Sequence, residues 1–220
     1  MGSCGAIGGM SFGVSAASYV DPVASGLVQQ SSGTWSGTTM SVALPAPTHP
    51  ASTLALIIAG NTTVPTPSGW TLREGQVNWM GHYLFTRSGG SNNWSIPTAN
   101  GMGTWYVVEV GNATYGSSAS ANESWDYSEY ATPSLVPSVG NCLLLASIAS
   151  GTDTNIVRTL SGWTGGFVEV ADICNPTGDY PMQGVAILSG TGDSIASFST
   201  SATFSSLSVG RSAIITALTL

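Results

Sequence analysis

The sequence predicts an all-β protein: an antiparallel β-sandwich built from two quasi-repeats of about five strands. Short runs rich in Val, Ile, Thr, Trp and Tyr recur along the chain between Gly, Pro, Asn and Ser, which is typical of strands and turns. No stretch free of Gly and Pro shows the apolar spacing of an amphipathic helix. One block of sequence also occurs twice, about 90 residues apart.

The first half of the chain is expected to contain five strands. Residues 54–59 form a continuous apolar run, which indicates a buried strand. Aromatic and β-branched residues dominate 81–87 and 105–110, and such side chains fit the pleated surface of a sheet. The expected strands are 38–44, 54–59, 81–87, 93–96 and 105–110.

The second half is expected to follow the same plan. Its apolar run, 143–148, is again followed by a polar loop and then by shorter runs of β-prone residues. The expected strands are 143–148, 166–171, 183–188, 195–198 and 212–218. Short strands at regular spacing with turn signals between them predict a sandwich or a barrel.

The repeat sets the expected domain plan. STLALIIAG (52–60) is followed by SGWT (68–71), and NCLLLASIA (141–149) is followed by SGWT (161–164). Downstream, 81–86 matches 182–188 in pattern and 105–110 matches 212–217. The expected plan is an extended Gly-rich arm (1–26), a first half-repeat (27–113), a connector (114–124) and a second half-repeat (125–220). Residues 27–220 are expected to form one sandwich body, with two small sandwiches as the alternative.

The composition excludes several classes of protein. Only 7% of the 220 residues are charged, against about 25% in typical proteins, and four arginines face eleven carboxylates for a net charge of −7. Nucleic-acid binding is not expected, because phosphate neutralisation needs clustered Lys and Arg. A hydrophobic fraction of 42% supports a core, but no apolar run approaches the roughly 18 residues of a membrane helix. We read the three cysteines as thiols in a reducing cytoplasm.

The repeated block resembles a family of tailed-bacteriophage virion structural proteins. The matching positions are 54–59, 67–71, 82–86 and 105–111, and again 143–148 and 161–164. Ser-Thr and Asn-Cys stand where the family pattern has Gly-Asp before the apolar strand. The resemblance implies a jelly-roll-like sandwich and a structural role in the virion, as a minor tail protein.

Catalytic and metal chemistry find little support in the sequence. His49 lies in a proline-rich turn and His82 alternates with Tyr83 in an expected strand, so a turn residue and a strand-face residue are the simpler interpretations. The acidic segment 123–130 could bind a hard cation, but its spacing matches no EF-hand loop, and a solvated connector is the simpler interpretation. We therefore predict no enzymatic activity, no metal site and no cofactor.

Some aromatic residues could contact a glycan or a protein partner. Sugar rings stack on exposed aromatic faces beside carboxylates and amides, whereas aromatics at a period of two can equally line the core. Trp70 and Trp163, in the repeated block, are assigned to the core. The candidates for glycan or partner contact are Trp79, Trp94, Trp125, Tyr127 and Tyr130.

These observations lead to one functional expectation with two alternatives. We expect a non-enzymatic virion component, made in the bacterial host cytoplasm, that contacts other virion proteins and further copies of itself. The arm is expected to order on a neighbouring subunit, so that its deletion would block assembly. A minor tail or tail-tip protein is the first choice, a head decoration protein the second, and a surface carbohydrate-binding module the third. No membrane partner is expected.

Overall fold

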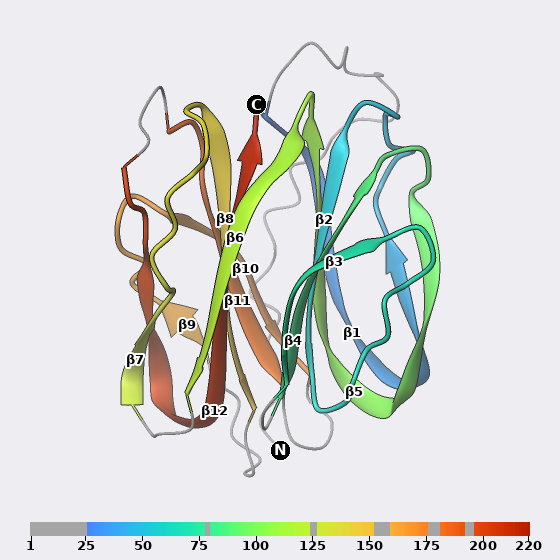
Figure 1. The fold of residues 1–220 in the computed structure, drawn as a ribbon. Coiled ribbons are helices and arrows are strands. Elements are labelled where there is room, and N and C mark those ends of the chain that lie inside the picture. The colour runs from blue at the N-terminus through green and yellow to red at the C-terminus, as the bar shows by residue number, and fades with distance from the viewer. Residues whose placement is uncertain (1–25, 78–79, 124–126, 152–158, 176–180, 192–195) are drawn as a thin grey trace.

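The computed structural model describes six stretches of the chain: residues 26–77, 80–123, 127–151, 159–175, 181–191 and 196–220. Within them every regular element is a β-strand, and every strand pair is antiparallel. The predicted all-β class is therefore confirmed. Two sheets stand face to face, as Figure 1 shows. The expected arm lies outside the described residues, except for Gly26, which begins the first strand.

The first sheet is made only from the first half of the chain. Its strand order is β1-β5-β2-β4-β3. The strands are β1 (Gly26–Ala43), β5 (Asn93–Gly111), β2 (Thr53–Gly60), β4 (Gly81–Ser88) and β3 (Thr71–Val77). The apolar run of the sequence is β2, which lies in the centre of this sheet and is buried along almost its whole length.

The second sheet is made from the second half of the chain. Its main order is β10-β11-β8-β12-β6, with two short strands, β7 and β9, paired to the beginning of β12. The strands are β10 (Val168–Cys174), β11 (Met182–Leu188), β8 (Cys142–Gly151), β12 (Ser201–Thr219), β6 (Thr114–Glu123), β7 (Tyr127–Ala131) and β9 (Leu160–Ser161).

The two sheets have the same strand order. One order becomes the other when β1, β5, β2, β4 and β3 are replaced by β6, β12, β8, β11 and β10, respectively. Both β5 and β12 have 19 residues, and both β3 and β10 have seven, with a bulge between their second and fourth residues. The jelly-roll-like detail that the family resemblance implies stays a prediction.

The stacking of the sheets has approximate two-fold symmetry. β1 lies against β10, β2 against β8 and β3 against β6. When each strand is replaced by its equivalent, the contact of β1 with β10 becomes the contact of β6 with β3, and the contact of β2 with β8 stays the same. The two halves thus meet through the same face, as the two subunits of a symmetric dimer do.

Long strands cover the outer face of each sheet. β1 and β5 bend near Gly37, which has a φ of 103°, and their far ends pair with each other from Thr39 to Ala43. In the second half, the beginning of β12 bends over in a similar way and pairs with β7 and β9. Each half thereby gains an outer layer, visible at the two sides of Figure 1.

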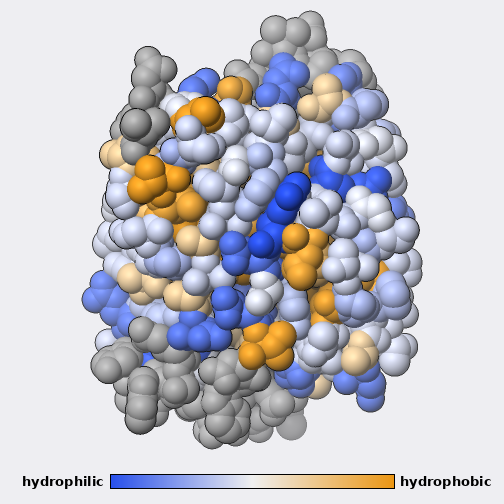
Figure 2. All heavy atoms as spheres, viewed as in Figure 1, coloured by the Kyte–Doolittle hydropathy of each residue, from blue (hydrophilic) through white to orange (hydrophobic). Residues whose placement is uncertain are grey.

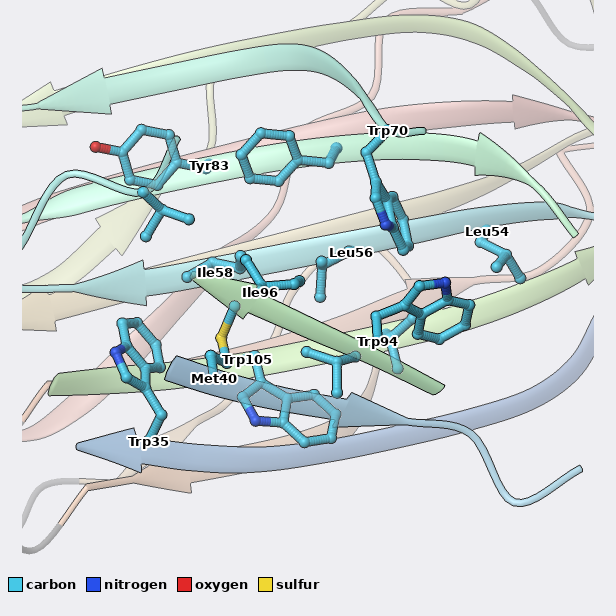
Figure 3. Close-up of a cluster of buried hydrophobic side chains, with 14 of the residues drawn as sticks. Trp35, Met40, Leu54, Leu56, Ile58, Trp70, Tyr83, Trp94, Ile96 and Trp105 are labelled. Carbon is cyan, nitrogen blue, oxygen red and sulfur yellow. The ribbon is translucent and has the colours of Figure 1, made fainter. Parts of the chain in front are cut away.

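Three hydrophobic layers follow from this arrangement. The central layer, between the sheets, joins Tyr106 and Val108 of the first half to Leu143 and Ile214 of the second. The outer layer of the first half is rich in tryptophan (Figure 3). Two smaller clusters, around Leu144 and around Phe204, fill the outer layer of the second half.

The structure corrects parts of the expected plan. Residues 114–124, expected as a connector, form β6 up to Glu123, because this Ser- and Ala-rich segment pairs along its length with β12. The two strands expected at 93–96 and 105–110 are one continuous strand, β5. Residues 196–198 make only an isolated bridge, from Phe198 to Leu135, instead of the strand expected at 195–198.

Candidate functional site

Trp94, a candidate for glycan contact, is buried in the outer layer of the first half. Its ring meets the ring of Trp70 edge to face, with centroids 5.4 Å apart, and both are labelled at one end of the cluster in Figure 3. The guanidinium of Arg87 lies 5.5 Å from the Trp70 ring and 5.6 Å from the Trp94 ring. Trp94 therefore lacks the open ring face that sugar stacking requires, because its faces pack against the protein. The core assignment of Trp70 agrees with its burial.

In the acidic-aromatic segment, Tyr130 is the aromatic residue whose side chain the structure describes. Tyr130 is buried, with the Arg211 guanidinium 5.5 Å from its ring. Tyr127 belongs to β7, where its backbone pairs with Ser208 of β12. Trp79 and Trp125 lie outside the described residues. Of the five predicted contact residues, Trp94 and Tyr130 are thus in the core, Tyr127 is placed by its backbone alone, and Trp79 and Trp125 are not placed.

His82 lies between the two sheets and is fully buried. Its Nε2 lies 3.1 Å from Ser147 Oγ, which accepts a hydrogen bond of 2.9 Å from Gln183 Nε2. Thr104 Oγ1 in turn donates to Gln183 Oε1 over 3.3 Å. His82 and Gln183 are the second residues of β4 and β11, so the two halves place equivalent polar side chains at the same central serine.

This environment gives His82 a structural role. Burial lowers the pKa of His82 to about 3, and the interaction of the ring with the backbone of Ser212 opposes this shift. The neutral ring cannot exchange a proton with a solvent-borne substrate at neutral pH, because no solvent reaches it. The pair of His82 and Ser147 is therefore part of the packed interface between the halves.

His49 is a turn residue, and its neighbour Glu109 is a feature that the sequence did not reveal. The Glu109 carboxylate is buried and accepts hydrogen bonds from the His49 backbone N–H (2.8 Å) and from Gln29 Nε2 (2.6 Å). His49 Nδ1 accepts from the Ala51 backbone N–H. A buried carboxylate with such partners anchors the turn between β1 and β2.

Two carboxylates on β10 have raised pKa values. Burial raises the pKa of Asp172 to about 7; the Leu160 N–H, which donates to Asp172, opposes this shift, and the negative charge of Glu169 adds to it. Burial also raises the pKa of Glu169. In the part of the chain that the structure describes, no three His, Cys, Asp or Glu side chains gather as metal ligands.

A polar seam joins the halves along one side of the sandwich, where β3 lies against β6. Ser118 and Ser120 of β6 each donate a 2.7 Å hydrogen bond to the Glu74 carboxylate of β3. Gln76 Nε2 donates to Ser120, and Asn122 Nδ2 donates to Gln76 Oε1. Figure 2 shows hydrophilic residues in a band down this face, beside hydrophobic ones. The polar side chains of this seam thus form hydrogen bonds with one another across the two sheets.

The outer strands of the two main sheet orders, β1, β3, β6 and β10, are the remaining candidate surface. In the described residues, β1 and β3 each pair with one neighbour in the first sheet, and β6 and β10 each pair with one in the second. An edge strand presents backbone N–H and C=O groups that can pair with another chain. These edges provide a route to assembly that needs no pocket and no catalytic group.

Comparisons with known proteins give no match for this chain, whether with protein-family models, curated proteins or solved structures. Among the described residues, no helix has the length and apolar character needed to span a membrane.

Proposed function

We propose that the chain is a non-enzymatic structural subunit of a bacteriophage virion, as a minor tail or tail-tip protein. The observation that carries the proposal is the block Ser-Gly-Trp-Thr, which occurs at residues 68–71 and 161–164. Its two tryptophans lie at corresponding places in the two halves. Trp70 is part of the outer layer of the first half, and Trp163 packs against the two outer clusters of the second half. The same block is what makes the sequence resemble virion proteins.

The surface chemistry supports a role in large permanent interfaces. With 33 Ser, 24 Thr and 28 Gly but few charges, the chain relies on uncharged groups for its surface polarity. Such groups cost less to desolvate than ions do, so subunits can bury them in contacts that depend little on salt. The burial of His82 and the hydrogen bonds that His49 makes within its turn favour structural roles for both histidines.

Location on the particle tests the proposal. Gold-labelled antibody against the chain, applied to intact phage particles and viewed by electron microscopy, is expected to mark the tail or its tip. Particles assembled without the chain serve as the control for antibody specificity. Label over the head would instead support a decoration protein. Particles that carry no label would contradict a virion role, and glycan binding would become the next activity to measure.

A further inference from the structure

The four edge strands differ in how well they resist pairing with another chain. Natural sheets protect their edges with charged side chains, bulges and proline. β3 carries Arg73 and Glu74 together with a bulge, and β10 carries Glu169 and Asp172 together with a bulge at the same position. Both of these equivalent edges are therefore protected in the same way.

The other two edges also contain bulges, near Val28 in β1 and at Gly116 in β6, but they carry almost no charge. β1 contains no charged residue and no proline over its 18 residues, and it exposes the apolar side chains Leu27 (43%) and Val28 (40%). β6 contains no proline, and its only charged residue is Glu123, at its end. Among the described residues, β1 and β6 each pair with a neighbour on one side alone. Long, uncharged edges of this kind are sites of association with further strands.

The same pattern occurs independently in the two halves. β1 and β6 are equivalent strands, as are β3 and β10, yet their sequences differ widely. In each half one edge carries two or more charged residues, and the other edge is neutral or nearly so. The two halves have divergent sequences and still share this difference in charge between their edges. We therefore attribute the difference to the function of the edges and not to the local sequence of one half.

We propose that β1 of one copy of this chain pairs antiparallel with β6 of a second copy, which joins the first sheet of one subunit to the second sheet of the next. This inference rests on the proposed function and names the partner for one of its contacts. The occupant is a second copy for two reasons. The two neutral edges can approach each other without repulsion between like charges, although every copy carries a net charge of −7. The edges are also equivalent, so their antiparallel pair has the local two-fold symmetry of a dimer contact.

The placement of the edges determines the type of assembly. β1 lies beside β10, at the edge of the sandwich opposite to the one where β6 lies beside β3. Each subunit can therefore bind two neighbours, one at either side. A head-to-tail contact of this kind generates a ring when the rotation closes and a filament when it does not.

Charged substitutions on each edge test the pairing. The first variant carries Ser32→Lys and Thr34→Lys on β1, and the second carries Thr114→Lys and Asn122→Lys on β6; all four side chains are exposed. The control, Leu72→Lys with Val77→Lys on β3, adds the same charge to an edge that is already protected. Light scattering after size exclusion measures mass, and thermal unfolding establishes that each variant is folded.

We expect the full-length chain and the β3 control to form species larger than a dimer. Each edge variant alone is expected to be a monomer of 22.3 kDa. Mixed in equal amounts, the two variants are expected to form a dimer, because each retains the edge that the other lacks. A full-length chain that stays monomeric at every concentration would overturn the proposal. So would an edge variant that dimerises alone, or a control that loses assembly.

The outcome is separable from that of the proposed function. Mass in solution reports self-association whether or not the chain belongs to a virion, while antibody labelling reports location whether or not the edges pair. Labelled tails together with a monomeric chain would refute the edge contact alone. Edge-dependent oligomers together with unlabelled particles would refute the virion role alone.

Discussion

The two halves of the molecule build the same sheet with different side chains. Four tryptophans, Trp35, Trp70, Trp94 and Trp105, fill the outer layer of the first half. The corresponding layer of the second half uses smaller groups together with a buried arginine, Arg211, whose guanidinium lies near the rings of Tyr130 and Phe204. Strand order is therefore compatible with very different packing, provided that each layer is filled.

One pair of equivalent positions shows how the difference arises. Gly103 and Arg211 are the eleventh residues of β5 and β12, and their cross-strand partners are Trp35 and Glu123. A Cβ atom on Gly103 would lie 2.1 Å from the Trp35 ring. The first half thus sets a large ring opposite a residue without a side chain, whereas the second half has a buried arginine at the equivalent position.

Truncation of the repeated tryptophans gives the largest expected difference between the halves. Trp70 is buried, and Trp70→Ala is expected to lower the free energy of unfolding by about 3–5 kcal/mol, as large-to-small changes in cores do. Trp163 is only partly buried, so Trp163→Ala is expected to cost clearly less. Denaturant unfolding of both variants measures the difference. Equal losses would show that the two tryptophans are packed alike.

The requirement for glycine at position 103 gives the next effect. Gly103→Ala would place its methyl group 2.1 Å from the Trp35 ring and 2.2 Å from the Ala59 carbonyl oxygen, and we expect a loss of about 3 kcal/mol. Gly151→Ala is the control, because a Cβ there would meet only Met80, at 3.9 Å. Thermal unfolding of both variants should separate them. A Gly103→Ala protein as stable as the control would disprove the close contact with Trp35.

The pH dependence of stability is expected to reveal two opposing groups, one from each half. The pKa of His82 falls from 6.5 unfolded to about 3 folded, so stability is lost as pH decreases from 6.5 towards 3, by up to about 1.4 kcal/mol per pH unit. The pKa of Asp172 rises from 3.8 to about 7, so the folded state gains stability as pH decreases from 7 towards 3.8.

Single substitutions should separate the contributions of His82 and Asp172 to the pH dependence of stability. His82→Gln places in β4 the residue that β11 has at the equivalent position, and its stability should rise as pH falls from 7 to 4. Asp172→Asn should lose stability more steeply than the unmodified chain below pH 6.5. Urea unfolding across this range measures both slopes. Slopes that both variants share with the unmodified chain would show that neither group has a shifted pKa.

The polar seam gives the smallest effect. Ser120→Ala removes one hydrogen bond to Glu74 and one from Gln76, and we expect a loss of about 1 kcal/mol. Ser36→Ala, at an exposed position of β1, is the matched control and is expected to change little. Denaturant unfolding at two salt concentrations compares them. A loss equal to the control would mean that the seam adds nothing to stability.

The parts of the fold that could be predicted are those with a strong local signal. The apolar runs at β2 and β8 and the repeat around Trp70 and Trp163 were sufficient to predict an all-β chain with two similar halves. β6 was missed because Ser and Ala carry little strand preference, and its pairing with β12 joins residues about 100 positions apart.

The candidate site was harder to predict, because exposure depends on long-range packing. Trp94 and Tyr130 have polar neighbours in the sequence, yet the bent ends of β5 and β12 bury them. Asn175 donates to the Trp35 carbonyl, 140 residues away, and no local pattern indicates such a partner. The contrast between neutral and charged edges is present in the sequence, but it can be read only once the strand order is known.

Amide hydrogen exchange tests the inequality of the edges most directly. Exchange is compared between dilute, dissociated chain and the assembled form, and followed by mass spectrometry of peptides from all four edge strands. We predict that assembly slows exchange in β1 and β6 and leaves β3 and β10 unchanged. Slowing confined to β3 and β10, or no slowing at any edge, would contradict the central claim that the neutral edges join the subunits.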